Sequence, residues 1–271
     1  MVTEIERAGT CPVWAPPLVA LQLLTRVPVP ALARLPRETA EIALGRSVGW
    51  FPLVGAFVGA LTAATVLIAG QVWPRTVAVL IALVVEALIT GAFHEDAVAD
   101  FCDGIGGGRN AAHARQIMKD SRIGSYGALG LTLAVVLRTA LMLSLPSSPL
   151  FFFVAIVAAA SFGRLVASIA MRAIPPAPVD QPAEGLANTV GRALPTNVLV
   201  TAAITALPGL LPFALLAPFA FLFAVAGVAV FLVWFGRLLQ RKLGGITGDC
   251  LGFSVYAGQL IVLLAASASW M

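Results

Sequence analysis

Charged residues are scarce in this chain. They make up 11% of its 271 residues, whereas 59% are apolar. Ordinary soluble domains carry roughly 25% charged residues. So few charges cannot solvate the surface of a soluble globular domain, and the composition therefore indicates an integral membrane protein.

Other absences narrow the function classes. No basic cluster alternates with aromatic residues, so nucleic-acid binding is not expected, and the net charge of +4 is read as a signal of membrane topology. The three cysteines, Cys11, Cys102 and Cys250, are scattered without zinc-ligand spacing and are expected to be reduced. The N-terminal segment lacks the pattern of a secretory signal, so none is expected. No internal repeat is found, which disfavours a transporter built from repeated halves.

Apolar stretches long enough to cross a bilayer recur along the chain. A span needs about 20 apolar residues. Trp14–Pro28 is shorter and broken by prolines, so an interfacial or re-entrant helix is expected there. We predict an all-α, polytopic membrane bundle of about seven transmembrane helices plus this N-terminal helix, forming one domain over residues 1–271. The expected spans are Val48–Gly70, Thr76–Phe93, Ser125–Leu145, Leu150–Met171, two halves of Val198–Phe235 divided near Leu210–Pro212, and Leu251–Trp270.

The basic residues predict the orientation of this bundle. Most of the 17 Lys and Arg residues fall in polar segments at one end, whereas Arg75 alone falls at the other end. By the positive-inside rule, the basic end faces the cytoplasm. The long polar segments 94–124, 173–194 and 236–250 are all predicted at this end as catalytic loops, where they could assemble one site.

Polar residues are concentrated between Phe93 and Tyr126, a stretch that holds five of the 13 acidic residues and both histidines. Asp96, Asp100 and Asp103 are spaced i, i+4 and i+7, which places three carboxylates along one face of a helix. The carboxylates would repel one another. A bound Mg²⁺ would relieve this repulsion, because magnesium is usually held by a few carboxylates and substrate phosphates. The triplet therefore predicts a metal site, with a solvated acidic helix face as the alternative.

Glycines and basic residues follow the carboxylates. Gly106 and Gly107 belong to the run DGIGGGRN, which predicts a tight turn whose backbone N–H groups could approach a phosphate. Lys119, Asp120 and Arg122 come next, and basic groups beside a carboxylate cluster suit a substrate with two phosphates. Positive charge at a membrane edge explains the same basic residues equally well.

Two further side chains are candidates for proton transfer. His94 precedes the acidic triplet, where it fits a general base, a substrate contact or an interfacial side chain. Asp249 follows Gly248 in the segment GGITGDCLG. A lone Asp before a span often caps the helix that follows. Its glycine-rich setting favours a fourth metal ligand, or a base for an attacking hydroxyl, at the same end of the bundle as the triplet.

Three ionisable residues, Glu86, Arg138 and Arg164, lie within predicted spans. Charges inside a bilayer are costly and are usually paired or functional. At about 1.5 Å per residue, Glu86 and Arg164 both lie roughly 12 Å from the cytoplasmic edge. We therefore predict that Glu86 pairs with Arg164.

The segments HEDAVADFCDGIGGG, IMKDSRIGSYG and GGITGDCLG, in this order, resemble the cobalamin synthase family, and LLTRVPVP and EGLANTVG resemble further family segments. The resemblance extends over most of the chain. It implies a magnesium-dependent enzyme of the bacterial inner membrane that joins α-ribazole, or its 5′-phosphate, to adenosylcobinamide-GDP and releases GMP. Ala97 departs from the family pattern, in which a glycine usually follows the Asp. The family's motifs fall on His94, Asp96, Asp100, Asp103, Gly248 and Asp249.

The resemblance also implies roles for these residues. Magnesium held by Asp96, Asp100, Asp103 and Asp249 would bridge the diphosphate of the substrate. His94 or Asp249 would take the proton from the attacking ribazole hydroxyl. Substrate contacts are expected from Gly106, Gly107, Lys119, Asp120, Arg122 and Gly248.

Two other functions fit parts of the sequence. A phosphotransferase of the CDP-alcohol type also combines a D-x-x-D-G pattern with membrane helices, but an Ala-Arg pair is expected after its DG and the chain has IGGGRN. A transporter with carboxylates at its site would place them near the bilayer midplane, whereas these acids lie at the edge. The oligomeric state stays open, and a homo-oligomer is compatible with the sequence.

Overall fold

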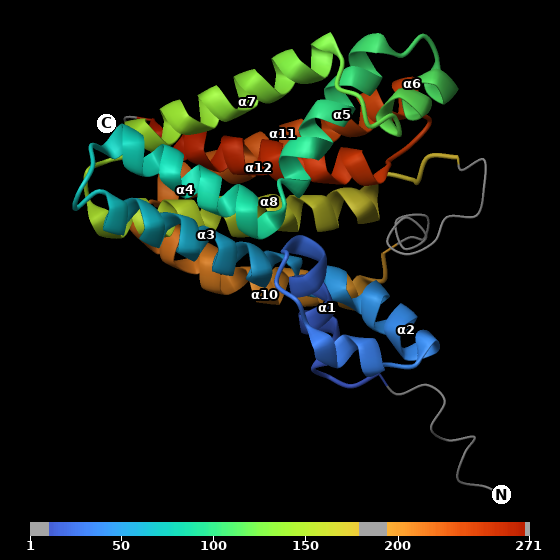
Figure 1. Ribbon diagram of the computed structural model, residues 1–271, viewed down its shortest axis with the longest axis horizontal. Coiled ribbons are helices and arrows are strands. Elements are labelled where there is room, and N and C mark those ends of the chain that lie inside the picture. Colours follow the sequence, from blue (N-terminus) through green and yellow to red (C-terminus); the bar gives the residue numbers. More distant parts are fainter. Residues whose placement is uncertain (1–10, 179–193, 269–271) are drawn as a thin grey trace, which may run out of the picture.

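The computed structural model describes residues 11–178 and 194–268. These residues are mainly helical, and the one β-bridge among them links Pro176 to Ile246. The expected all-α fold is confirmed. The helices are α1 (Ala15–Leu24), η2 (Pro30–Arg34), α2 (Arg37–Ser47), η3 (Val48–Trp50), α3 (Phe51–Ala69), α4 (Arg75–Thr90), α5 (Phe93–Gly107), α6 (Ala111–Met118), α7 (Ser125–Ser144), α8 (Pro149–Ala173), α10 (Thr196–Leu216), α11 (Pro218–Lys242) and α12 (Gly248–Ser267) (Figure 1).

Six helical segments of the described part are long and apolar enough to cross a membrane, and a seventh is gained if α4 and α5 together count as one. This range confirms the expectation of about seven spans. An 88° bend separates α4 from α5. α4 runs alongside the other long helices, whereas α5 crosses them steeply (Figure 1). We therefore take α4 as the crossing arm and α5 as a helix at the end of the bundle.

α8 is the central helix of the bundle, and 83% of an 18-residue apolar stretch of this helix is buried. Small residues let its neighbours approach closely. A Cβ atom on Gly55 of α3 would lie 2.5 Å from the carbonyl oxygen of Ala160, and one on Gly258 of α12 would lie 2.9 Å from the Cα atom of Gly163. Packing through small residues is the usual way in which transmembrane helices associate.

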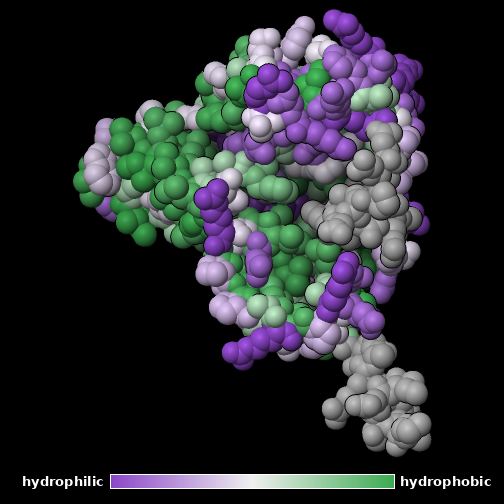
Figure 2. Space-filling view, turned by 45° about the vertical axis from the view of Figure 1, so that its right-hand side comes forward, coloured by the Kyte–Doolittle hydropathy of each residue, from purple (hydrophilic) through white to green (hydrophobic). Residues whose placement is uncertain are grey.

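Polar and apolar residues occupy different parts of the surface. Figure 2 brings forward the end of the bundle that carries α6, and hydrophilic residues gather there, whereas the part receding to the left is covered by apolar side chains. Exposed large apolar residues are most frequent on α3, α4, α7, α10 and α11, and include Leu133, Leu211 and Phe223. An apolar belt beside one polar end is the surface that a bilayer requires.

Two expected boundaries are wrong. Residues 198–235 do not divide near Leu210–Pro212, because α10 runs through Pro208 and Pro212 to Leu216, and the break falls at Ala217. Proline is tolerated inside transmembrane helices, and at the first position of α11 the missing N–H of Pro218 costs nothing. The segment expected as a basic loop after residue 235 is also helical as far as Lys242.

Candidate active site

A sharp elbow ends α4 and starts α5. Gly91 (φ 72°) and Ala92 (φ 56°) both adopt the left-handed conformation, and α5 begins at Phe93. The predicted span therefore stops at Thr90. The elbow turns the acidic stretch into a helix that lies across the end of the bundle.

α5 is the helix that the spacing of Asp96, Asp100 and Asp103 predicts, and that prediction is confirmed. Its apolar side rests on an aromatic cluster: the ring of Phe101 stacks on Phe253 of α12 with centroids 3.9 Å apart and lies 5.6 Å from Phe235 of α11. This packing leaves Asp96 exposed and Asp100 half-buried at the polar end.

The first turn of α12 brings Asp249 beside this helix. Gly252 makes the approach close, because a Cβ atom there would collide with the side chain of Ala97. Asp249 is half-buried and close enough to Asp96 for their charges to interact. Burial, followed by the charges of Asp96, Asp249 and Asp103, raises the pKa of Asp100 to about 6. The two predicted halves of the site therefore meet.

Backbone contacts hold the surrounding segments together. Ala177 donates its N–H to Ile246 at 3.0 Å, and Ile246 donates to Pro175 at 2.9 Å. Arg115 of α6 donates from Nη1 to the carbonyl of Leu243 at 2.8 Å. The three polar segments that the sequence assigned to one end are thus in contact, as far as the structure describes them. EGLANTVG (184–191) lies outside the described residues.

Asp103 has a defined structural partner. Its side chain is buried, and its two oxygens accept hydrogen bonds from the backbone N–H groups of Gly124 at 2.7 Å and Gly127 at 2.8 Å. A carboxylate at this position caps the first turn of α7, and its negative charge interacts favourably with the positive end of the helix dipole. This role was not predicted, because the spacing of the three aspartates does not show which backbone groups lie beside them.

The carboxylates suit a divalent cation by their chemistry, but they do not form a closed metal cage. No group of three or more His, Cys, Asp or Glu side chains in the described part of the chain is arranged to hold a metal ion. Magnesium keeps several waters and needs few protein ligands, because substrate phosphates complete its shell. The charges of Asp96, Asp100 and Asp249 interact with one another, so one or two of these carboxylates could serve as ligands of such an ion.

The expected glycine turn is wrong. α5 continues through Gly104, Gly106 and Gly107. A Cβ atom on Gly106 would lie 2.5 Å from the ring of Tyr126, and one on Gly104 would lie 2.6 Å from the side chain of Met118. These two glycines let α7 and α6 pack against α5. Phosphate binding by Gly106, Gly107 and the exposed Gly248 stays a prediction.

The basic residues after α6 are at the surface. Lys119 is exposed at the end of α6. Arg122 forms a two-pronged ion pair with Asp120, with Nη2 and Nε donating to the carboxylate at 2.7 and 3.0 Å. These hydrogen bonds lower the pKa of Asp120 to about 2. Arg122 would therefore exchange one acidic partner for another on binding a phosphate.

His94 is buried among apolar and cationic groups. It is 3% exposed, lies against the ring of Phe93, and is close enough to Arg164 and Arg138 to interact with their charges. Its Nε2 atom has no hydrogen-bond partner among the described residues. His94 and Asp96 are two positions apart and lie on different sides of the helix. The geometry therefore favours Asp249 over His94 as the base.

The predicted pairing of Glu86 with Arg164 is wrong. Glu86 pairs with Arg138 of α7, whose Nη2 donates to both carboxylate oxygens at 2.8 and 2.7 Å. The Thr62 hydroxyl adds a 2.7 Å hydrogen bond to Glu86. Arg164 instead donates from Nη1 to the carbonyl of Ala160, one turn back in its own helix. Equal depth suggested the partner, but depth along the bundle does not show which helices are neighbours.

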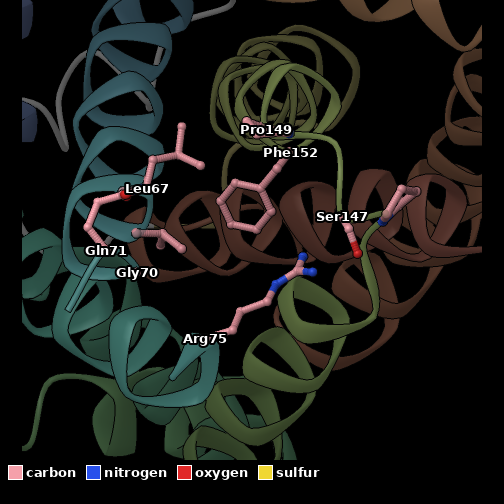
Figure 3. A pocket seen from close by; sticks show the side chains of 9 residues that line it. Leu67, Gly70, Gln71, Arg75, Ser147, Pro149 and Phe152 are labelled. Atoms are coloured by element: carbon pink, nitrogen blue, oxygen red, sulfur yellow. The ribbon is translucent and has the colours of Figure 1, made fainter. Parts of the chain in front are cut away.

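A cavity of about 270 Å³ lies at the opposite end of the bundle, between the α3–α4 and α7–α8 connections (Figure 3). Arg75 lines it together with Gln71, Ser147 and Phe152. The Nη2 atom of Arg75 donates to the carbonyl of Met142 in the last turn of α7 and to that of Leu145, which follows the helix, each at 2.9 Å. Arg75 thereby stabilises the end of α7, and this cavity is not part of the carboxylate site.

The comparison with known proteins decides the family. The family model described as cobalamin-5-phosphate synthase matches residues 16–267. The chain belongs to this family. The resemblance seen in the sequence is therefore confirmed, and the chain is a transferase of cobalamin synthesis.

Three relatives illustrate the similarity, each named adenosylcobinamide-GDP ribazoletransferase. The protein of Leptothrix cholodnii is 37% identical over 93% of both chains. That of Ralstonia nicotianae is 37% identical over 90% of this chain and 92% of its own, and that of Rhizobium etli 37% over 88% and 94%. No solved structure matches the chain.

Proposed function

We propose that this chain transfers the phosphocobinamide group of adenosylcobinamide-GDP to α-ribazole, or to its 5′-phosphate, and releases GMP. The relatives' shared name indicates the reaction. The observation that supports a site for it is the meeting of Asp249 on α12 with Asp96 and Asp100 on α5, at the polar end of the bundle.

Asp96, Asp100 and Asp249 would hold Mg²⁺, and the ion would neutralise negative charge on the diphosphate and on the departing GMP. Two observations support this ligand set. Asp96 is exposed and the other two are half-buried, so all three can be reached from the polar end. Their repulsion disfavours the metal-free carboxylate form of Asp100. Asp103, whose oxygens bind two N–H groups, is better suited to holding α7 against α5.

The side chains around these ligands would bind and orient the substrates. Lys119 and Arg122 can hold phosphate oxygens, and Asp120 keeps Arg122 in place until a phosphate replaces it. The ribazole hydroxyl would attack the phosphorus on the cobinamide side of the diphosphate. The new bond joins that oxygen to phosphorus, the bond to the GMP oxygen breaks, and the hydroxyl proton passes to the carboxylate of Asp249.

The site would face the cytoplasm across the bacterial inner membrane. Arg115 of α6 contacts Leu243 just after α11, whose last turns carry Arg237 and Arg241, and Arg122 follows α6. Arg75 instead lines the cavity at the other end. This asymmetry is the signal on which the positive-inside rule rests.

Purified protein in lipid nanodiscs, supplied with GDP-cobinamide, α-ribazole and magnesium, tests this function through GMP release. We expect GMP in proportion to ribazole joined, and none when ribazole or magnesium is omitted. Asp100→Asn should abolish release while inserting normally, and Glu41→Gln, an exposed carboxylate on α2, is the matched control. Wild-type protein that instead transfers the phosphoalcohol group of a CDP-alcohol to an acceptor hydroxyl with release of CMP, or that only transports a cation, would refute the proposal.

A further inference from the structure

The elbow between α4 and α5 needs external support. A left-handed conformation is readily adopted by Gly91 but is unfavourable for Ala92, whose Cβ crowds the following carbonyl. Such conformations persist when surrounding contacts fix them. The bend is therefore set by what holds its two arms, and not by the elbow residues alone.

One guanidinium contacts both arms. Arg138 of α7 binds Glu86, which precedes the elbow, through Nη2 at 2.8 and 2.7 Å. Its Nη1 atom lies 3.7 Å from the carboxylate of Glu95, which follows the elbow. The side chain of Arg138 is 4% exposed, that of Glu86 6% and that of Glu95 19%, so bulk water screens neither contact well.

We propose that Arg138 is a positioning residue that fixes the angle of the α4–α5 elbow, and so places the carboxylates of α5 opposite Asp249. Glu95 is the residue immediately before Asp96, so a tether on Glu95 acts directly on the start of the acidic face. The catalytic part of this inference rests on the proposed function.

The surroundings favour a clamp over a simple buried ion pair. Glu86 alone neutralises Arg138, and its Oε2 atom also accepts the bond from Thr62. Glu95 adds a second carboxylate, whose Oε2 atom is buried without a hydrogen-bond partner among the described residues. Burying that extra charge is costly unless it is compensated. It gains the attraction of Arg138 and, to a smaller extent, that of Arg164, and the other face of Arg138 is covered by the ring of Tyr256 at 5.6 Å.

α7 also holds the far end of the same helix. Asp103, near the end of α5, accepts the N–H groups of Gly124 and Gly127 at the start of α7. α7 therefore grips α5 at two points, Arg138 to Glu95 and Gly127 to Asp103. The two contacts are eight residues apart on α5, a distance of about 12 Å along a helix. Two such points fix both the position and the direction of the acidic face.

Glu95→Gln tests the clamp, because it weakens the tether to α5 and leaves the pair of Glu86 and Arg138 intact. Glu41→Gln is the control, since Glu41 forms an exposed pair with Arg37 at 3.1 Å. Hydrogen exchange of the wild type and both variants in nanodiscs reports the clamp without substrate. We expect exchange in 93–107 to become about tenfold faster in Glu95→Gln, with α8 unchanged. The magnesium concentration for half-maximal GMP release should rise about tenfold, and Glu95→Asp should restore part of both losses.

Two results would overturn the clamp: wild-type exchange in 93–107 together with wild-type magnesium activation, or exchange that accelerates equally in every helix. The second result would assign Glu95 only a general role in stability. If the wild type releases no GMP, the proposed function fails, while the exchange of 93–107 still decides whether Glu95 and Arg138 hold the elbow.

Discussion

Asp103 on α5 accepts a 2.8 Å hydrogen bond from the backbone N–H of Gly127, in the first turn of α7. Its other oxygen accepts from Gly124. A residue that the sequence pattern assigned to a metal site thus joins two helices, one carrying the acidic face and one crossing the membrane. Asp103, the last aspartate of the motif, therefore has a structural role, whereas Asp96 and Asp100 remain accessible for ligand binding.

Asp103→Asn should destabilise the protein by about 1–3 kcal/mol, because the amide NH₂ would face a backbone N–H and leave that buried donor unpaired. The thermal unfolding midpoint in detergent measures the change. Glu38→Gln, on the exposed face of α2, should leave the midpoint unchanged. A midpoint for Asp103→Asn equal to that of the wild type would show that these two hydrogen bonds contribute nothing.

Gly252→Ala should lower GMP release, because the new Cβ would meet Ala97 and push Asp249 away from α5. Replacing Ala97 with Gly in the same chain removes that contact and should restore part of the rate. Gly45→Ala is the control, since a Cβ there has nothing within 4 Å. Full activity in Gly252→Ala would contradict the close approach of the two helices, as would a double variant no better than the single one.

Arg138→Met should destabilise the fold by about 3–5 kcal/mol, because it leaves the Glu86 carboxylate buried without its partner. Glu86→Gln added to Arg138→Met should recover part of that loss, since the remaining group is then neutral. The same Glu86→Gln should not rescue Arg164→Met, because Arg164 bonds to Ala160 instead. A double-mutant cycle on unfolding midpoints compares the two pairs. If Glu86→Gln rescued Arg164→Met but not Arg138→Met, Glu86 would pair with Arg164, as the sequence predicted.

Asp100 should make the metal-free protein less stable as the pH rises. Its pKa is raised from 3.8 to about 6 in the folded state, so the folded state binds the proton more tightly than the unfolded state. The resulting stability is complete below about pH 3.8 and is lost as the pH rises through about 6.

Unfolding midpoints between pH 4 and 8, measured in EDTA, check this dependence. Asp100→Asn should flatten the profile and be more stable than the wild type at pH 8, although it releases no GMP. Magnesium should stabilise the wild type at pH 8 and leave Asp100→Asn largely unaffected. Parallel profiles for the two proteins would contradict the repulsion among the carboxylates.

The sequence predicted the parts of this fold that depend on composition and helical periodicity. Hydropathy located the spans, and the i, i+4, i+7 spacing located α5. Charge bias placed Asp249 at the same end as α5, where the structure brings it beside Asp96. What failed depended on packing between helices. The sequence alone suggests a turn at Gly106, but the missing side chain there leaves space on α5 that the ring of Tyr126 fills. Likewise, the choice of Arg138 over Arg164 as partner of Glu86 follows from which helices are neighbours.

In the proposed function, α5 and α12 together supply one magnesium-dependent site. GMP release measured against magnesium concentration, for the wild type and Asp249→Asn, tests it most directly. We predict that Asp249→Asn needs at least about tenfold more magnesium, or turns over far more slowly at saturating magnesium if the carboxylate also takes the proton. A variant with the wild-type rate and the wild-type magnesium curve would show that Asp249 is outside the site and contradict the account.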